Sequence, residues 1–258
     1  MTYFLAPGEL SEGASVVLEG EEARHLLQSR RMRAGERFGV QDAQGRRFWA
    51  ELAQAERGTA RILVQGAAPI PPLPDPPVRL WLASVKDKAA EQVVQKATEL
   101  GVAELHVFTA RLSTVAHAEL AAPRTQQRWA RIALEACKQC DRQAPPTLRV
   151  WPSLAALLGA DLPVGSGWLL HRDGGPPPPS GSAGAAAGSA GAGSTAAGHT
   201  AGAAAGVTVL VGPEGGLTEE EIVAACAAGF TRVRLGPLTL RTDTAALAGC
   251  AVAVQAGR

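Results

Sequence analysis

The chain has few aromatic residues and no long hydrophobic run. Tyr, Phe and Trp together make up 4% of its 258 residues, with a single tyrosine. No apolar stretch comes near the length of about 20 residues that a helix needs to cross a bilayer. The first residues, MTYFLAPGEL, lack a basic segment followed by an apolar one. We therefore expect a soluble, cytoplasmic protein without a signal peptide or a transmembrane helix.

A strong net charge is also lacking. The formal net charge is +1, and the isoelectric point is about 7.8. Nucleic-acid-binding domains are usually basic, so any RNA contact must depend on local clusters of charge. Hydrophobic residues make up 46% of the chain, which is enough for two domains or one large one, although many are alanine.

Cysteines are few, and all four (Cys137, Cys140, Cys226 and Cys250) lie in predicted helices. Disulfides are disfavoured inside cells. The C-x-x-C pair at 137–140 is typical of half a metal site or of a redox pair. No second pair or histidine pair stands at zinc spacing, and the two thiols share one apolar side of a helix. We favour ordinary packing and expect no bound metal.

Residues 207–217, VTVLVGPEGGL, predict a buried strand followed by a tight turn. Thr218 and Glu221 form a T-x-x-E capping box, so a helix should begin there with its free N–H groups near the turn. Strand, glycine-rich turn and helix are typical of a ligand site at the carboxyl edge of a parallel sheet.

The turn does not match a phosphate-binding loop. No Lys follows its glycines as in a P-loop, and the G-x-G-x-x-G fingerprint is absent. The carboxylate of Glu214 would repel a pyrophosphate at close range. These features point away from nucleotides with phosphate tails and toward a neutral or cationic ligand.

A similar pattern follows near the end of the chain. Residues 231–235 predict a short strand that Gly236 and Pro237 end, and residues 240–244 lead into an apolar helix at 245–256. We expect two adjacent strands whose loops form one composite pocket. A further strand at 167–171 should end near them.

The first 70 residues predict a compact barrel. Short strands are expected at 3–5, 15–18, 36–41, 46–52 and 59–65, with one helix at 21–28. The proline-rich segment 71–77 reads as a stiff linker. Residues 78–258 then alternate strands with helices, which favours an α/β fold with a parallel sheet. Strands are expected at 78–83, 105–108 and 148–151, and helices at 87–100, at 123–141 and from Ser153.

Basic residues gather in the predicted barrel, beside His25 and Trp49. Arginine side chains suit phosphate oxygens, and an aromatic ring can stack on a base. The alternative is a solvated charged face, because acidic residues are interspersed, and these residues by themselves leave both interpretations open. The arginines are Arg24, Arg30, Arg31, Arg33, Arg46 and Arg47. A second basic group lies along the helix predicted at 123–141 and directly after it. It consists of Arg124, Arg128, Arg131, Lys138 and Arg142.

Residues 174–206 are of low complexity. After PPPP they contain only Gly, Ala, Ser and Thr with one histidine. Without large apolar side chains such a segment cannot offset the entropy cost of ordering. We expect a disordered insertion between two strands of the sheet.

GPEGGLTEEE, followed by LG, LRT and a Thr-Ala helix start, resembles the RsmE-type 16S ribosomal RNA uridine-N3 methyltransferases of the SPOUT (trefoil-knot) class. ELGV at 99–102, EACKQC at 135–140 and the arginine segment near Arg30 agree with that pattern. The resemblance implies a PUA-like β-barrel at 1–70 and a SPOUT domain with a trefoil knot at 78–258. It also implies a homodimer, with 16S ribosomal RNA in the small subunit as partner.

The resemblance implies S-adenosylmethionine as the methyl donor and N3 of a uridine as the acceptor. It assigns RNA binding to Arg24, Arg30, Arg31, Arg33 and Arg142. Arg241 is the candidate catalytic cation, with holding of the loop or of the cofactor carboxylate as the alternative. The implied cofactor-binding residues are Leu170, Gly212, Pro213, Glu214, Gly215, Gly216, Leu235, Gly236, Leu240, Arg241 and Thr242.

Two positions depart from the family pattern. Leu238 stands where a basic residue is usual, and Asp243 replaces a glutamate. Loss of the basic side chain would weaken an RNA or cofactor contact, whereas Asp243 keeps the charge with a shorter reach. Two other interpretations stay open. One is a SPOUT enzyme acting on another RNA, such as transfer RNA, and the other is a non-catalytic RNA-binding homologue.

Overall fold

A computed structural model describes residues 3–178 and 206–256. The chain divides into two compact units. The first consists of Met1–Pro72 and Leu134–Pro145, and the second of Leu73–Ala133 and Pro146–Arg258. Within the described ranges, none of the helices has the length and apolar content needed to cross a bilayer.

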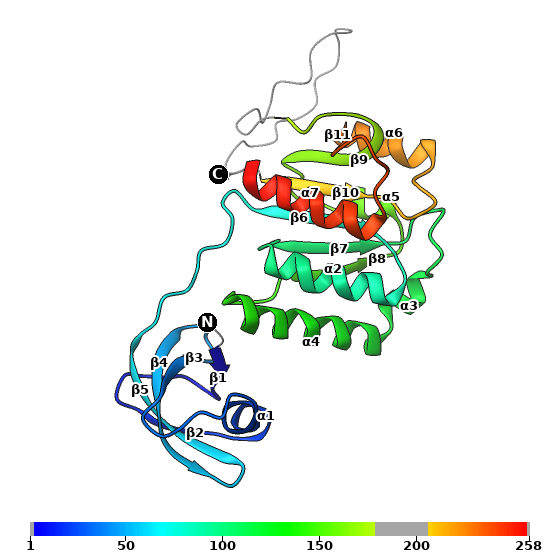
Figure 1. Cartoon of the computed structure of the whole chain (residues 1–258). Helices are drawn as coiled ribbons and strands as arrows, with labels where there is room; N and C mark the ends of the chain where they lie inside the picture. Colours follow the sequence, from blue (N-terminus) through cyan, green and yellow to red (C-terminus); the bar gives the residue numbers. More distant parts are fainter. Residues whose placement is uncertain (1–2, 179–205, 257–258) are drawn as a thin grey trace. The chain divides into compact units, whose positions relative to one another are not determined.

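The first unit is built on a curled five-stranded sheet in the order β1-β3-β4-β5-β2 (Figure 1). β1 pairs with β3 in parallel, and the other pairs are antiparallel. Its apolar core includes Phe4, Leu18, Leu26 and Phe38. The elements are β1 (Tyr3–Leu5), β2 (Ser15–Leu18), α1 (Gly20–Arg24), the π-helical turn η1 (His25–Ser29), β3 (Arg37–Gln41), β4 (Arg47–Glu56) and β5 (Thr59–Ala67).

The second unit contains a six-stranded parallel sheet in the order β11-β9-β10-β6-β7-β8. The predicted α/β fold with a parallel sheet is confirmed. The strands are β6 (Val78–Ala83), β7 (Glu104–Phe108), β8 (Thr147–Trp151), β9 (Ser166–Gly175), β10 (Val207–Val211) and β11 (Phe230–Val233). The helices are α2 (Asp87–Glu99), α3 (His117–Ala121), α4 (Pro123–Cys140), α5 (Leu154–Leu158), α6 (Glu219–Ala227) and α7 (Thr242–Ala256), of which α4 belongs to the first unit from Leu134 onward.

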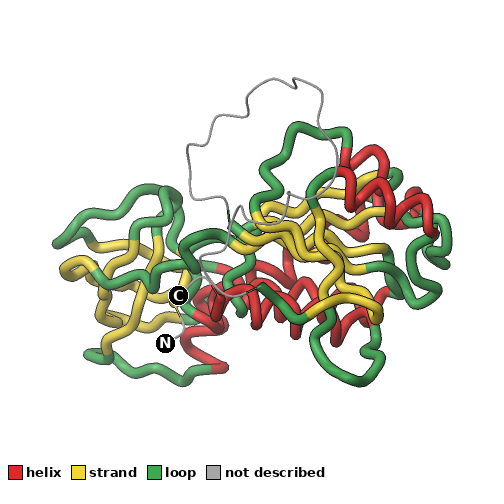
Figure 2. The backbone as a smooth tube through the Cα atoms, turned by 90° about the horizontal axis from the view of Figure 1, so that it is seen from above, coloured by secondary structure: helices red, strands yellow, loops and turns green. Residues whose placement is uncertain are grey.

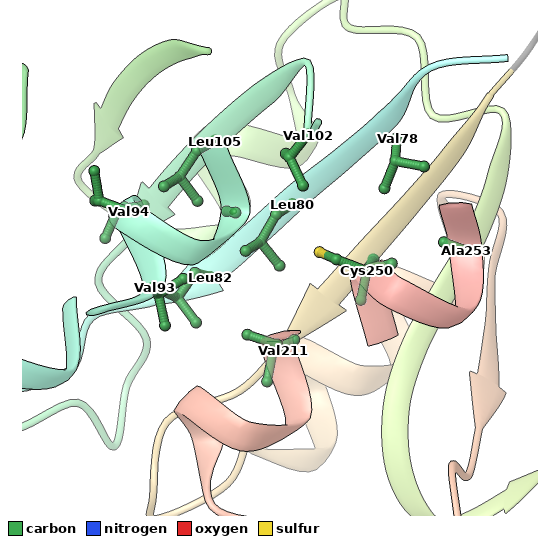
Figure 3. Close-up of a cluster of buried hydrophobic side chains, with 14 of the residues drawn as sticks. Val78, Leu80, Leu82, Val93, Val94, Val102, Leu105, Val211, Cys250 and Ala253 are labelled. Carbon is green, nitrogen blue, oxygen red and sulfur yellow. The ribbon is translucent and has the colours of Figure 1, made fainter. Parts of the chain in front are cut away.

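Helices lie on both sides of this sheet (Figure 2). One core joins the sheet to α2, α7 and the first turns of α4, and Cys250 and Ala253 of α7 belong to it together with Leu80 of β6 (Figure 3). A second core joins the opposite face to α5 and α6 through residues such as Leu210 and Ile222. Alternate residues of each strand therefore serve different cores, as the pleat of a β-strand requires.

Three expectations about this unit were wrong. The strands that precede the two predicted loops, β10 and β11, are not adjacent, because β9 pairs with both. β9 continues to Gly175, so the predicted insertion does not begin at 174: a Cβ on Gly174 would lie 2.5 Å from the carbonyl carbon of Val233 on β11. α7 begins at Thr242, three residues before its predicted start. The predicted disorder at 179–205 lies outside the described residues.

Gly249 lets helix α7 lie close to the sheet. A Cβ at this position would be 2.8 Å from Leu170 Cδ1 and 2.9 Å from Val209 Cγ1, closer than side-chain atoms tolerate. Glycine normally weakens a helix interior, but here its missing side chain makes room for β9 and β10. The start of α7 is thereby held beside the carboxyl ends of these strands.

A buried histidine joins two neighbouring strands of the same sheet, β7 and β8. His106 on β7 is 0% exposed. Its Nδ1 accepts a hydrogen bond of 3.0 Å from Trp151 Nε1, and its Nε2 lies 3.0 Å from Glu104 Oε2. Because Nδ1 accepts, the neutral ring carries its proton on Nε2 and donates it to Glu104. Burial lowers the pKa of His106 below its ordinary value, against the opposite effect of Glu104.

We expect the free energy of unfolding to decrease as the pH falls below about 6.5, where unfolded histidine binds a proton that folded His106 resists. The contribution of this group is fully present above that pH. His106→Gln cannot take up the proton, so its stability should depend less steeply on pH, by at most about 1.4 kcal/mol per pH unit. Urea unfolding between about pH 7.5 and pH 5.5 measures both slopes. Equal slopes would contradict this assignment.

Candidate functional site

A cavity of about 650 Å³ opens at the carboxyl ends of β10 and β11, beside residues 169–172 in the middle of β9. In a parallel sheet these ends meet at one edge, where the loops that follow can share a ligand. Three segments line the cavity, namely residues 169–172, 211–217 and 233–242, together with Ala245 of α7. The two predicted loops therefore meet in one pocket, although β9 separates their strands.

Every residue predicted to bind a cofactor lies on this cavity. The set comprises Leu170 in the middle of β9, five consecutive residues after β10, and five residues from the segment after β11 up to the first residue of α7. The candidate catalytic residue is among the last five. They are Leu170, Gly212, Pro213, Glu214, Gly215, Gly216, Leu235, Gly236, Leu240, Arg241 and Thr242.

The turn at 212–216, here named the GPEGG turn, is shaped by its own backbone. The N–H of Gly216 donates to the carbonyl of Pro213 at 2.9 Å. Gly216 has a φ of +77°, which favours glycine. The capping box predicted after the turn is present: Thr218 Oγ1 accepts from the N–H of Glu221, and the Glu221 carboxylate accepts from the N–H of Thr218. The start of α6 is thereby fixed directly after the cavity wall.

Residues 234–241, between β11 and α7, form another part of the cavity wall. A Cβ on Gly236 would meet no atom within 4 Å, and its φ lies outside the left-handed region. Leu238, the departure from the family pattern, is 78% exposed. Arg241 is exposed just before α7, and its carbonyl accepts from the N–H of Ala245 at 2.7 Å.

Several cavity residues were not among the predicted site residues. His171 and Arg172 follow Leu170 within β9. The ring of His171 accepts a hydrogen bond at Nδ1 from the N–H of Asp173 at 3.2 Å, so a neutral ring has its proton on Nε2. The sequence could have indicated both residues, because they lie at or directly after the carboxyl end of the strand predicted at 167–171. The others are Leu169, Val211, Leu217, Val233, Arg234, Pro237, Leu238, Thr239 and Ala245.

Four of the predicted RNA-binding arginines are exposed on the first unit. Arg24 ends α1, and Arg30, Arg31 and Arg33 follow η1. Glu36 lies in the same stretch, where its carboxylate accepts from the N–H of Arg33 at 2.9 Å. The arginines thus form one exposed basic segment within ten residues of sequence.

Arg142, the fifth predicted RNA-binding residue, is not on the surface. It is 5% exposed, its Nε donates to the carbonyl of Ala144 at 2.6 Å, and burial lowers the pKa of its guanidinium. Its carbonyl accepts from the Tyr3 hydroxyl at 2.9 Å. The expectation of an exposed basic residue here was wrong, because residues 134–145 pack into the first unit.

Two more of the expected surface cations are buried in the first unit. Arg47 lies 4.0 Å from the ring centre of Tyr3 and donates to the carbonyl of Asp141 at 3.0 Å. Lys138 forms an ion pair with Glu22. These charges are paired within the unit and do not contribute to a basic face.

The C-x-x-C pair lies on α4 without the properties of a reactive site. Cys137 is buried, and burial raises its pKa to about 11, so its thiol is protonated at neutral pH. Cys140 is partly exposed. Among the described residues, no group of three or more His, Cys, Asp or Glu side chains could hold a metal ion.

Residues 71–254 match the family described as an RNA methyltransferase domain, and residues 18–65 match an RNA methyltransferase PUA domain. The chain is 30% identical over 237 residues to a ribosomal RNA small subunit methyltransferase E of Mycobacterium tuberculosis, covering 91% of this chain and 84% of that protein. The corresponding Bacillus subtilis protein is 26% identical, with 94% and 91% covered.

A solved relative has a similar fold. The ribosomal RNA small subunit methyltransferase E of Neisseria gonorrhoeae, in a crystal structure bound to S-adenosyl methionine, superposes with a TM-score of 0.75 and 26% identity. The alignment covers 98% of this chain and 96% of that one. Together with the two family matches, this likeness assigns the chain to the RNA methyltransferase domain family that includes the ribosomal RNA small subunit methyltransferase E proteins.

Proposed function

We propose that the protein transfers a methyl group from S-adenosylmethionine to N3 of a specific uridine in 16S ribosomal RNA. The observation that carries this proposal is the cavity that the GPEGG turn and residues 233–242 share in a member of this family. The relative from Neisseria gonorrhoeae, named a ribosomal RNA small subunit methyltransferase E, is bound to S-adenosyl methionine.

The cavity fits this cofactor in size and chemistry. A volume of about 650 Å³ lies within the usual range for small-molecule sites. Gly236 has neither a positive φ nor a neighbour that a Cβ would strike, so packing within the chain does not explain its lack of a side chain. A ligand lying against the main chain there would explain it. Arg241 and the first turn of α7 suit the carboxylate of an amino acid moiety.

The cofactor supplies a methyl group on a positively charged sulfur, which makes it a strong electrophile. The chain's task is then alignment of the acceptor with that methyl group. N3 of uridine must lose its proton before or during attack, and a nearby cation favours the resulting anion. We assign this role to Arg241, with binding of the cofactor carboxylate as its alternative.

We assign the binding of the RNA substrate to the first unit. Arg24, Arg30, Arg31 and Arg33 are exposed and suit phosphate oxygens of RNA, which extends the PUA match to a binding role. We also propose domains at 1–70 and 78–258 joined by the linker 71–77, a trefoil knot in the second domain, a homodimer, and a cytoplasmic location. The RNA partner is the small ribosomal subunit or its precursor.

We expect Gly236→Ala to fold normally and to bind S-adenosylmethionine more weakly. The added methyl group meets no protein atom and no strained φ, but it projects from the cavity wall. A loss of roughly tenfold in affinity, about 1.4 kcal/mol, is expected from one misplaced methyl group. Calorimetric titration measures it. Gly66→Ala on β5 is the matched control, since its Cβ also meets no atom within 4 Å and it lies outside the cavity. If the unsubstituted protein, Gly236→Ala and Gly66→Ala bind S-adenosylmethionine with equal affinity, Gly236 does not contact the cofactor.

The purified protein should methylate small ribosomal subunits from a strain that lacks the endogenous activity. Radiolabelled S-adenosylmethionine would mark the RNA, and mass spectrometry of its nucleosides should give N3-methyluridine. A radioactive label in transfer RNA instead would show that the substrate is a different RNA. A methyl group on another atom would show that N3 of uridine is not the acceptor. Binding of the cofactor without transfer to any RNA would favour a non-catalytic homologue.

Substitutions of Arg241 separate its two proposed roles. If it stabilises the uridine anion, Arg241→Lys retains much of the activity, while Arg241→Ala lowers kcat by roughly 100-fold with little change in the KM for the cofactor. If it holds the cofactor carboxylate, the KM rises instead and kcat changes less. Steady-state kinetics with varied cofactor, repeated across pH, distinguishes them. Unchanged kinetics in Arg241→Ala would exclude both roles.

A further inference from the structure

Glu221 in the first turn of α6 receives hydrogen bonds from two separate segments of the second unit. Its Oε2 accepts from the N–H of Thr218 at 2.9 Å, as a capping box requires. Its Oε1 accepts from the N–H of Arg111 at 3.0 Å. Arg111 belongs to the segment between β7 and α3, residues 109–116, here named the β7 loop. A capping box needs only one of the two carboxylate oxygens, so the second oxygen has a different structural role.

The β7 loop and the GPEGG turn are in direct contact. A Cβ on Gly215 would lie 3.1 Å from Leu112 Cβ and 3.3 Å from the Leu112 carbonyl oxygen. Leu112 therefore takes the space beside Gly215 that a side chain would need. The loop has internal bonds as well, since Ser113 Oγ accepts from the N–H of Ala110 at 3.0 Å. A defined segment thus supports the GPEGG turn.

A second interaction joins the same parts. The pKa of Glu220 is lowered by a hydrogen bond from its own backbone, by Thr218 and by the positive charge of Arg111. The charge of Arg111 is the smallest of these causes, and the hydrogen bond from its N–H to Glu221 is the contact that fixes it to α6. The first turn of α6 is the common anchor for the GPEGG turn and the β7 loop.

We propose that Glu221 is a positioning residue of the cavity, which fixes the GPEGG turn against the β7 loop through its second carboxylate oxygen. It acts through Gly215, which lines the cavity, whereas Glu221 itself does not. A turn with three glycines has many accessible conformations. Holding it in one conformation raises the fraction of molecules that are ready to bind, and apparent affinity follows that fraction. This inference rests on the proposed function, because it takes the cavity as the cofactor site.

Glu221→Gln isolates the second oxygen. A glutamine at this position still completes a capping box with its single oxygen. Its NH₂ group cannot accept a hydrogen bond from the N–H of Arg111. We expect amide hydrogen exchange in the β7 loop and the GPEGG turn of the full chain to accelerate by roughly tenfold. The Kd for S-adenosylmethionine, measured by calorimetry, should rise by about the same factor.

Glu219→Gln is the matched control, since it removes the same charge from the same helical turn. Glu219 is 70% exposed, and its carboxylate pairs with Arg232 at 3.1 Å, away from the β7 loop. An exposed pair contributes little. Exchange in both segments and the cofactor Kd should therefore stay within about twofold of the unsubstituted protein.

Unchanged exchange of the β7 loop in Glu221→Gln would overturn the proposed clamp. Faster exchange with an unchanged Kd would overturn its influence on cofactor binding. Equal effects in Glu219→Gln would attribute them to charge at the start of α6 and overturn the role of the second oxygen. If the unsubstituted protein binds no S-adenosylmethionine, the proposed function fails separately, and the exchange comparison still decides whether the clamp exists.

Discussion

The candidate site depends on the burial of strand β10. All five residues of Val207–Val211 are buried, and the strand pairs with β9 on one edge and β6 on the other. Val209 and Val211 face the core of α2 and α7, whereas Leu210 faces the core beneath α5 and α6. A shift of one residue would send each side chain to the opposite core. The register is therefore fixed, and so is the place where the GPEGG turn leaves the sheet.

Local sequence signals were sufficient for the parts of the site but not for their neighbours. GPEGG and T-x-x-E specify a turn and a helix start within a dozen residues, and both are present. The rule that parallel strands end at one edge correctly brought the two loops together. It did not reveal that β9 lies between β10 and β11, because side-chain periodicity within a strand contains no information on which strand pairs with it.

Buried charge was the least predictable feature. A helix with Arg124, Arg128, Arg131, Lys138 and Arg142 reads as a basic surface, since charged side chains are mostly exposed. Lys138 and Arg142 are buried in the first unit, where Lys138 meets a partner 116 residues away and Arg142 a backbone carbonyl two residues away. Those partners include Glu22 and the alanine carbonyl at 144. The hydrogen bond from the N–H of Arg111 to Glu221 could not be predicted either, because Arg111 lies 110 residues earlier in the sequence.

Buried ion pairs also explain how a nearly neutral chain can present a basic surface. Arg47 with Asp141, Arg79 with Glu104, and Lys138 with Glu22 are pairs whose cations are buried. Such pairs cancel in the net charge and add little to the field at the surface. The exposed segment from Arg24 to Arg33 remains concentrated in sequence. Because charges act over roughly 8–10 Å at physiological salt, the density of arginines in that segment, and not the total of +1, decides whether an RNA phosphate is attracted there.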